Sequence, residues 1–195
     1  MVQRRSCFDE GRLQVTAAVR LLQHSRLLQW HQTKAEFAAV HWQEFDDYCH
    51  KSDPNFGRLI CWITFSAGAE LLVKGVCLAN RVDIRGKPRP DGIVLFGTLG
   101  NLWDKQKKKK GQKTHLDCLF EKVGAEPDQQ NRVLVTYQNL TTTIRNRDAH
   151  AYVPNVRNND FDLVSERFVP CFNLLMSWLP EGFRIMSDDE LAKLC

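Results

Sequence analysis

The chain has 195 residues, of which 43% are hydrophobic and 26% are charged, and its formal net charge is +4. This length fits one domain with a core of its own, and so weak a positive charge permits nucleic-acid binding without requiring it. The seven cysteines include no Cys-x-x-Cys spacing, which argues against a disulfide framework and against a zinc module.

The apolar segments indicate a chain that does not enter a membrane. The most apolar window, residues 59–69, has eleven residues, which is too short to span a bilayer. The N-terminal residues carry charge but no apolar stretch follows them, so they do not resemble a signal peptide. We therefore expect a cytoplasmic protein without membrane contact.

The N-terminal part of the chain is expected to be helical. Apolar spacing predicts helices over residues 33–50 and over residues 12–30, the latter marked by Val15, Val19 and Leu22. Turn residues then interrupt the pattern, so residues 1–52 are expected to form an N-terminal helical extension.

Residues 57–80 form the strongest predicted helix. A broad apolar face is expected of a central helix, and here it comprises Ile60, Thr64, Ala67, Leu71 and Leu78, with Leu59, Ile63 and Val73 beside them. Glu70 and Lys74 lie four residues apart in the order that favours an ion pair. As an alternative, Glu70 hydrogen-bonds into the polar motif described below.

Residues 81–114 are expected to form an irregular basic insert. Its first part has two prolines and two glycines in the eight residues RGKPRPDG, which excludes regular structure. Six of the ten residues in DKQKKKKGQK are lysines. One interpretation is an RNA-binding loop, with bases stacked on Trp103 and phosphates held by Lys107, Lys108, Lys109 and Lys110. The other is a solvated loop.

Two further helices are predicted in the C-terminal part of the chain. One covers residues 129–150, with the stripe Val133, Tyr137, Leu140 and Ile144. The other covers residues 165–179, with the stripe Phe168, Phe172, Leu175 and Leu179, and Pro170 either starts or kinks it. Because strand signals are weak, we expect an all-α, up-and-down helical bundle that forms a single domain over residues 1–195.

A polar cluster follows the first of these helices in the sequence TIRNRDAHAYVP, residues 143–154. A histidine with a pKa near roughly 6.5 moves protons at neutral pH. A guanidinium pairs with a phosphate and stabilises the charge that develops on it. Arg145 and His150 therefore suit phosphodiester cleavage without a metal. The structural alternative is a capped helix end whose side chains are solvated.

The spacing of this Arg–His pair decides little by itself, because Arg26 and His31 repeat it. In an ideal helix, five residues turn the side chain by about 140°, so Arg145 and His150 of one chain would face different directions. A two-fold dimer would bring one motif against the other. We therefore expect a homodimer with the site at its interface.

The segment IRNRDAHAY resembles the core motif of the HEPN superfamily, in which an arginine and an adjacent polar residue precede a histidine. The helices predicted around it resemble those of that family as well. The resemblance implies a dimeric helical bundle that acts as a metal-independent endoribonuclease in toxin–antitoxin, CRISPR or anti-phage systems. It implies that Arg145 and His150 are catalytic and that Asn146 supports them, and we expect Arg147 beside them to bind RNA.

Tyr152 extends this resemblance. In the toxin branch that is partnered with minimal nucleotidyltransferases, a tyrosine lies two residues after the histidine and receives AMP from the partner. The present chain is longer and carries the basic insert. The implied partner is therefore a nucleotidyltransferase antitoxin or a larger defence complex, and the alternative is a tyrosine that packs beneath the loop.

A second hypothesis assumes the same fold without catalytic activity. In it, the chain is a non-catalytic helical RNA-binding or scaffold subunit of a larger defence complex. The intact Arg145 and His150 favour the enzyme, and the unmatched N-terminal residues favour the scaffold. We expect no cofactor and no metal, because the nearest ligand group is better explained as a helix surface: His41, Asp46, Asp47 and His50.

Overall fold

The computed structural model describes residues 5–25, 27, 54–86, 102, 113–140 and 163–193. This part of the chain is helical and contains no strand, which confirms the all-α class for the described residues. Its elements are α1 (Cys7–His24), α4 (Pro54–Ala79), α5 (His115–Val123), α6 (Pro127–Asn139), η5 (Leu163–Phe168), α9 (Val169–Ser177) and α10 (Asp188–Ala192). The helix predicted over residues 33–50 and most of the predicted insert lie outside the described residues.

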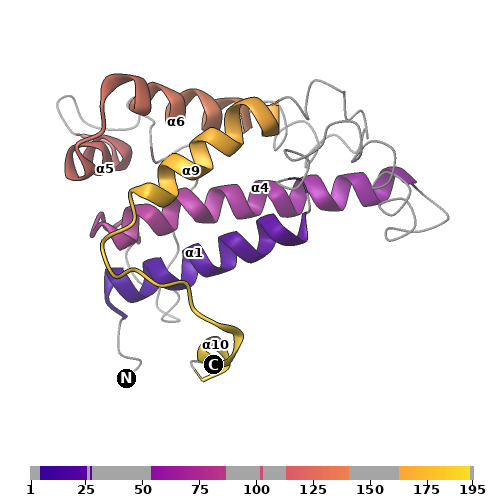
Figure 1. Ribbon diagram of the computed structural model, residues 1–195, viewed down its shortest axis with the longest axis horizontal. Coiled ribbons are helices and arrows are strands. Elements are labelled where there is room, and N and C mark those ends of the chain that lie inside the picture. The colour runs from indigo at the N-terminus through magenta and orange to yellow at the C-terminus, as the bar shows by residue number, and fades with distance from the viewer. Residues whose placement is uncertain are drawn as a thin grey trace.

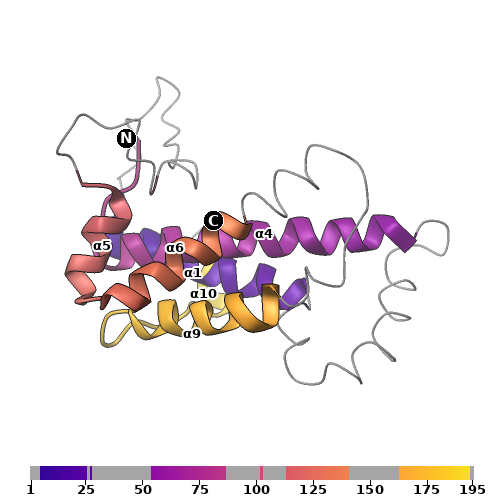
Figure 2. The same ribbon diagram turned by 90° about the horizontal axis from the view of Figure 1, so that it is seen from above.

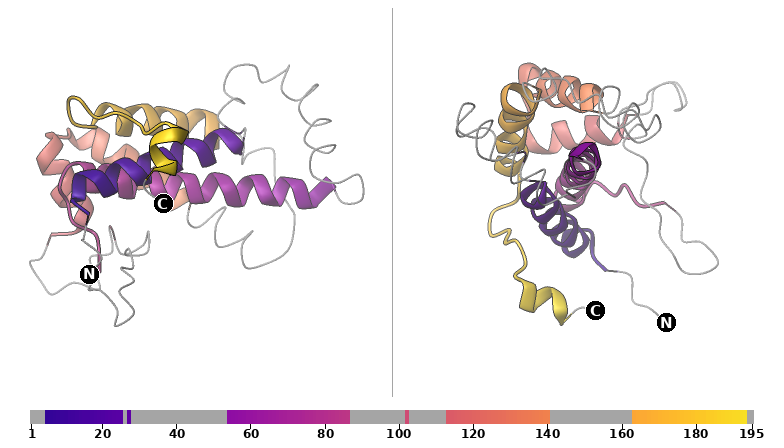
Figure 3. Two further views of the ribbon diagram at one scale, coloured as in Figure 1. Left: turned by 90° about the horizontal axis from the view of Figure 1, so that it is seen from below. Right: turned by 90° about the vertical axis from the view of Figure 1, so that its right-hand side faces the viewer.

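The long helices run along one axis and alternate in direction (Figures 1 and 2). α4 lies in the middle, with α1 on one side and α6 and α9 on the other, as the end-on view shows (Figure 3, right). Their apolar side chains form one core cluster, to which α1 contributes Val15, Ala18 and Leu22. The N-terminal helix is therefore part of the core of the bundle.

Glycines allow α1 and α4 to approach each other closely. A Cβ atom on Gly11 would lie 2.5 Å from the backbone nitrogen of Ala79, and one on Gly75 would lie 2.8 Å from the backbone nitrogen of Val15. Both separations are far shorter than an ordinary carbon–nitrogen contact. Glycine at these positions lets the two backbones pack against each other where any larger residue would hold them apart.

Side-chain caps set both ends of α1, which begins and ends earlier than predicted. Ser6 accepts a hydrogen bond from the backbone N–H of Asp9 at 3.1 Å, and this satisfies one of the unpaired amides at the start of the helix. The helix ends at His24. There, the Ser25 hydroxyl donates to the carbonyl oxygen of Leu22 at 2.6 Å and takes an acceptor that would otherwise serve the next helical turn.

The buried face of α4 differs from the predicted one. Phe65 and Leu72 are fully buried, whereas Ala67 is exposed and Ile63 has 44% of its surface exposed. Apolar residues occur all round this helix, so their spacing alone does not fix which side meets its neighbours. The predicted positions that are fully buried are Val73 and Leu78.

The short helix α5 was not predicted from the sequence. Thr114 accepts from the backbone N–H of Asp117 at 3.0 Å, and the Asp117 carboxylate accepts from the backbone N–H of Thr114 at 2.8 Å. Gly124 then ends the helix with a φ of 63°, a left-handed conformation that glycine adopts at little cost. The residues that α5 buries are Leu116, Leu119 and Phe120.

The last long helix changes geometry just before Pro170. Leu163–Phe168 form a π-helical segment, η5, and the α-helical part begins at Val169. Pro170 lies in the first turn of α9, where its missing N–H removes no α-helical hydrogen bond. Of the two roles predicted for this proline, starting the helix is the one observed.

One helix in the described part of the chain is long and apolar enough to cross a membrane by length and composition. Its window Trp62–Ala79 has 18 residues with a mean hydropathy of 1.4. The expectation that no apolar stretch reaches this length is therefore wrong, because the apolar pattern continues past Glu70 and Lys74. However, 67% of the window is buried inside the protein, as expected of a helix in a protein core.

Candidate functional site

The residues predicted to carry the chemistry lie outside the described part of the chain. They are Arg145, Asn146, Arg147, His150 and Tyr152 of the polar motif, and Trp103, Lys107, Lys108, Lys109 and Lys110 of the basic insert. The described residues nearest to the motif along the chain are those on either side of residues 141–162.

The residues on either side of that segment are anchored in the core of the bundle. Leu140 directly follows α6 and is 3% exposed. After the segment, Val164 in η5 is fully buried. Both residues belong to the single core cluster. The end of α6 and the start of η5 lie toward the same side of the view, part-way along α4 (Figure 2). The bundle therefore holds the residues on either side of the segment that carries the motif.

A buried tyrosine holds α6 against α4. The Tyr137 hydroxyl donates a hydrogen bond to the backbone oxygen of Ala69 at 2.8 Å, and the side chain is fully buried. Burial is the main cause that raises the pKa of Tyr137 well above its ordinary value, and nearby thiols and Glu70 add to it. The hydroxyl therefore stays neutral and remains a donor at physiological pH.

The predicted ion pair on α4 is present and largely buried. Lys74 Nζ lies 2.5 Å from Glu70 Oε1, and Lys74 has only 7% of its surface exposed. Glu70 is also close enough to Tyr137 to affect its pKa. The α6 side of α4 thus carries charge where most helices have only apolar residues. The alternative in which Glu70 bonds into the polar motif concerns residues outside the described part.

A polar groove lies between α6 and the segment formed by η5 and α9. Its volume is about 490 Å³, and it is lined by Asp128, Asn131, Arg132, Val135, Thr136, Glu166, Arg167 and Pro170. Within the described part of the chain, no ion pair joins its arginines to its carboxylates. Guanidinium and amide groups bind phosphate oxygens well, while the carboxylates limit how much negative charge the groove can hold.

This groove was not predicted from the sequence. A signal was present on α6, where Asp128 and Arg132 lie four residues apart and share a face. The matching signal on the other wall is the pair Glu166 and Arg167, which belongs to the π-helical turn. Such turns occur often at functional sites. That the two charged surfaces face each other follows only from the packing of the helices.

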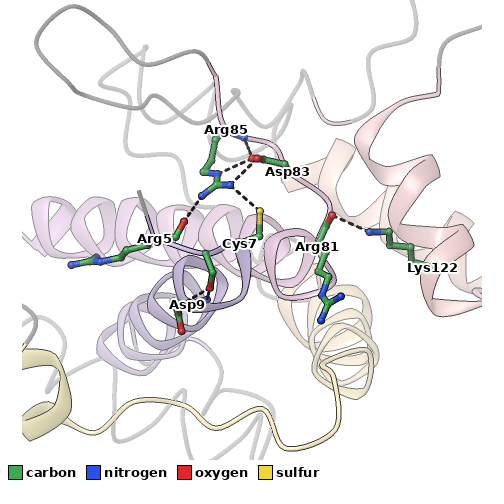
Figure 4. Close-up of polar contacts among 8 residues, drawn as sticks. Arg5, Cys7, Asp9, Arg81, Asp83, Arg85 and Lys122 are labelled. Carbon is green, nitrogen blue, oxygen red and sulfur yellow. Dashed lines mark hydrogen bonds and ion pairs between the residues drawn. The ribbon is translucent and has the colours of Figure 1, made fainter. Parts of the chain in front are cut away.

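A guanidinium fixes the start of the basic insert (Figure 4). Arg85 donates to both carboxylate oxygens of Asp83, at 2.8 Å and 2.7 Å. It also donates to the backbone oxygen of Arg5 at 2.9 Å and contacts Cys7 Sγ at 2.9 Å. The hydrogen bond to Asp83 is the main cause that raises the pKa of Arg85. This junction ties the insert to the start of α1.

A second set of bonds ties the same turn to α5. The Lys122 ammonium donates to the backbone oxygens of Asn80 and Arg81, at 3.0 Å and 2.9 Å. Arg81 has a φ of 59°, which is the left-handed region that few residues other than glycine adopt. Lys122 therefore satisfies two carbonyls at a strained turn, and this role is structural.

The described residues show neither a metal-binding cluster nor a reactive thiol in the core. No group of three or more His, Cys, Asp or Glu among them could hold a metal ion. Cys77 and Cys171 are free and buried, and burial is the main cause that raises the pKa of each thiol to about 12. Since the thiolate is the reactive species, both are inert at neutral pH.

Comparisons with protein-family models, with curated proteins and with solved structures find no match to this chain. The assignment of a function therefore depends on the motif, on the bundle that carries it and on the chemistry of the residues involved.

Proposed function

We propose that this protein is a metal-independent endoribonuclease of the HEPN type that acts in a cytoplasmic defence or toxin–antitoxin system. The observation that carries the proposal is the motif RNRDAH, which follows α6 along the chain of a helical bundle. In the proposed reaction, His150 removes the proton from the ribose 2′-hydroxyl, and the 2′-oxygen attacks the adjacent phosphorus. The bond from phosphorus to the 5′-oxygen breaks, and the 5′-oxygen leaves with a proton taken from solvent. Arg145 binds the phosphate and stabilises its developing charge, and Asn146 supports them.

The described structure supports this proposal through the surroundings of the motif. The long helices alternate in direction, as the family's bundle requires (Figure 1). The segment that carries the motif begins and ends on buried residues, Leu140 and Val164, so a site there would have a rigid support. Arg132 and Arg167 line the groove between α6 and the segment formed by η5 and α9, where they offer phosphate contacts.

Replacement of one side chain tests the chemistry. His150→Ala should abolish RNA cleavage in the presence of EDTA, and the wild-type products should carry a 2′,3′-cyclic phosphate. His24→Ala is the matched control, because His24 is exposed at the end of α1 and should leave the rate unchanged. Cleavage that EDTA abolishes and magnesium restores would rule out the metal-free mechanism.

The proposed site is shared by two chains. If the dimer forms the site, then mixing inactive Arg145→Ala chains with inactive His150→Ala chains should restore part of the activity, because one interface would hold both intact residues. Sedimentation should show a dimer at micromolar concentration. A monomer that still cuts RNA would refute the shared site.

Tyr152 is the proposed point of control by a nucleotidyltransferase. An added nucleotide would place a phosphate beside Arg145 and block access of the RNA. Tyr152→Phe should keep its nuclease activity and escape silencing by such a partner. An intact-mass measurement after co-expression that finds no adduct on Tyr152 would remove the toxin branch and leave the nuclease proposal in place.

The second candidate function is a non-catalytic RNA-binding or scaffold subunit of a larger defence complex, and the lysine run favours it. Replacing Lys107, Lys108, Lys109 and Lys110 with alanine should weaken RNA binding and reduce its salt slope by roughly 0.7 for each phosphate that is no longer bound. Binding that depends on these lysines in a chain whose cleavage is indifferent to His150 would favour this candidate over the enzyme.

A further inference from the structure

The C-terminal segment follows a single line of side chains along α1. Phe8, Arg12, Thr16 and Arg20 occur at every fourth position of the helix and therefore lie on one face. We define these four residues as the α1 ridge. The segment that contacts it comprises residues 183–190. It runs beside α1 and ends in α10, which projects from the bundle (Figure 3).

Each residue of the ridge has a partner in this segment. The Phe8 and Phe183 rings lie 5.6 Å apart in an edge-to-face arrangement. The backbone N–H of Met186 donates to Thr16 Oγ1 at 3.0 Å. The carboxylates complete the set, since Asp188 pairs with Arg20 and Glu190 lies 3.7 Å from Arg12.

The two halves of the segment are held with different strength. Met186 is 8% exposed and its hydrogen bond is buried, so it is a firm anchor. By contrast, α10 buries no residue against the described part of the chain, and the carboxylates of Asp188 and Glu190 are 87% and 54% exposed. Ion pairs as exposed as these contribute little, so α10 can leave the ridge while the core stays folded.

The ridge is suited to an extended anion. Arg12 and Arg20 are eight residues apart, which places them about 12 Å apart along the helix, too far for one phosphate to bridge. Arg12 Nη2 lies 3.7 Å from Glu190, and the Arg12 side chain is 26% exposed. A phosphate can take paired hydrogen bonds from a guanidinium, and a chain of phosphates could engage both arginines.

We propose that Arg12 and Arg20, the two charged residues of the α1 ridge, bind single-stranded RNA, and that the acidic residues 188–190 cover them as an intramolecular competitor. The chain is basic overall and carries the lysine run, which favours a polyanionic partner. The inference rests on the proposed function for the identity of the polymer. It adds to that function a second contact surface and a means of regulating access to it.

The test measures RNA affinity in the His150→Ala background, so that no RNA is cut. Replacing Asp188 and Asp189 with Asn and Glu190 with Gln should tighten binding of a fluorescent oligouridylate by about 3- to 30-fold, the range that two exposed ion pairs can supply. The salt slope should become steeper by roughly 1.4, since two more phosphates are contacted. Adding Arg12→Gln and Arg20→Gln to this variant should remove the gain.

A matched control separates local competition from total charge. Replacing Glu121, Glu126 and Glu181 with Gln changes the net charge equally, at residues whose described ion pairs do not involve the ridge arginines. An equal gain in this control, or a gain that survives loss of both arginines, would overturn the proposal. So would a ridge that binds polyglutamate but not RNA. If the triple variant does not fold, Asp188→Asn alone gives a smaller gain by the same logic.

The outcome is independent of the test of catalysis. A wild-type chain that never cuts RNA, but whose affinity rises when the acidic residues are neutralised, would refute the proposed nuclease and support the ridge. A chain that cuts RNA with no effect of the acidic residues on binding would support the nuclease and refute the ridge.

Discussion

The two sides of α4 are built from different chemistry. On the side that faces α1, Gly11 and Gly75 let the backbones meet, and Val15 and Leu22 are fully buried. The side that faces α6 holds a largely buried ion pair and the hydroxyl of Tyr137. The polar groove lies beside α6, between it and the segment formed by η5 and α9. One central helix therefore serves as a scaffold on one face and supports polar groups on the other.

The difference has a physical meaning. Close apolar packing stabilises a fold, whereas a buried ion pair rarely adds stability over apolar residues of the same size. Local choices that do not favour stability are expected near functional sites. The ion pair Glu70–Lys74, on the side of α4 that faces α6, is such a choice. The polar motif follows α6 along the chain.

The largest effect is expected from breaking the buried ion pair. Glu70→Ala would leave the Lys74 ammonium, 7% exposed, without its carboxylate. We expect a loss of about 3 kcal/mol in the free energy of unfolding, at the low end of the range for buried pairs because Glu70 is partly exposed. Urea denaturation followed by circular dichroism measures it.

Two controls sharpen that result. Glu121 pairs with Lys113 at the surface, so Glu121→Ala should change the stability little. Replacing both Glu70 and Lys74 with Leu should restore most of the stability, because no charge remains buried. A double variant as unstable as Glu70→Ala would show that the pair is needed for reasons other than the cost of an unpaired charge.

The second effect tests the glycine contact on the other side of α4. Gly11→Ala would place a Cβ 2.5 Å from the backbone nitrogen of Ala79, so the helices must separate. Overpacking of this kind costs about 1–3 kcal/mol, and alanine recovers about 1 kcal/mol through its helix propensity. We expect a net loss of up to about 2 kcal/mol in the free energy of unfolding.

The exposed position Gln23 of the same helix provides the reference for this change. Gln23→Ala should be neutral or nearly so, because alanine fits a solvent-exposed helix position well. If Gly11→Ala proved as harmless as Gln23→Ala, the close approach of α1 and α4 would not be needed for stability.

The third effect depends on pH. Burial raises the pKa of Cys77 and of Cys171 to about 12 from an ordinary value of 9.0. Because the unfolded chain ionises first, the stability held below pH 9 declines as the pH rises toward 12, by about 1.4 kcal/mol per pH unit for each thiol. Urea midpoints at pH 7.5 and pH 10 should therefore differ more in the wild type than in a Cys77→Ala, Cys171→Ala variant.

The pH series has a clear contrary outcome. Equal shifts of the midpoint in the wild type and in the double variant would mean that the thiols do not contribute. Tyr137, whose pKa is also raised by burial, would then be one source of the alkaline sensitivity.

Helices with a single apolar stripe could be predicted from the sequence, and those without one could not. Val133, Tyr137 and Leu140 on the α6 side are all nearly or fully buried, as predicted. On α4, apolar residues surround the helix, and the predicted position Ala67 is exposed. Periodicity carries information only where polar residues mark the other face.

Short helices and sites that form between helices could not be predicted from the sequence either. The local signals for α5, Thr114 with Asp117 and the terminal Gly124, were present in the sequence. However, a helix this short has too few apolar residues to show a helical repeat. The groove requires Arg132 and Arg167 to lie across from each other. That relation depends on how two helices pack, which no local pattern encodes.

The smallest effect on stability, and the most direct test of the contrast, concerns the groove. Arg132 and Arg167 are exposed and make no ion pair within the described residues, so replacing each with Ala should change the stability by less than about 0.5 kcal/mol. If the groove contacts RNA near the motif, each replacement should weaken binding and reduce the salt slope by roughly 0.7.

Asp128→Asn and Glu166→Gln should act in the opposite direction, because they remove the charge that opposes a phosphate. Fluorescence anisotropy with labelled single-stranded RNA in the His150→Ala background measures both. Four variants with unchanged stability and unchanged affinity would show that the polar side of the bundle is a solvated surface, and the contrast between the two sides of α4 would then concern folding alone.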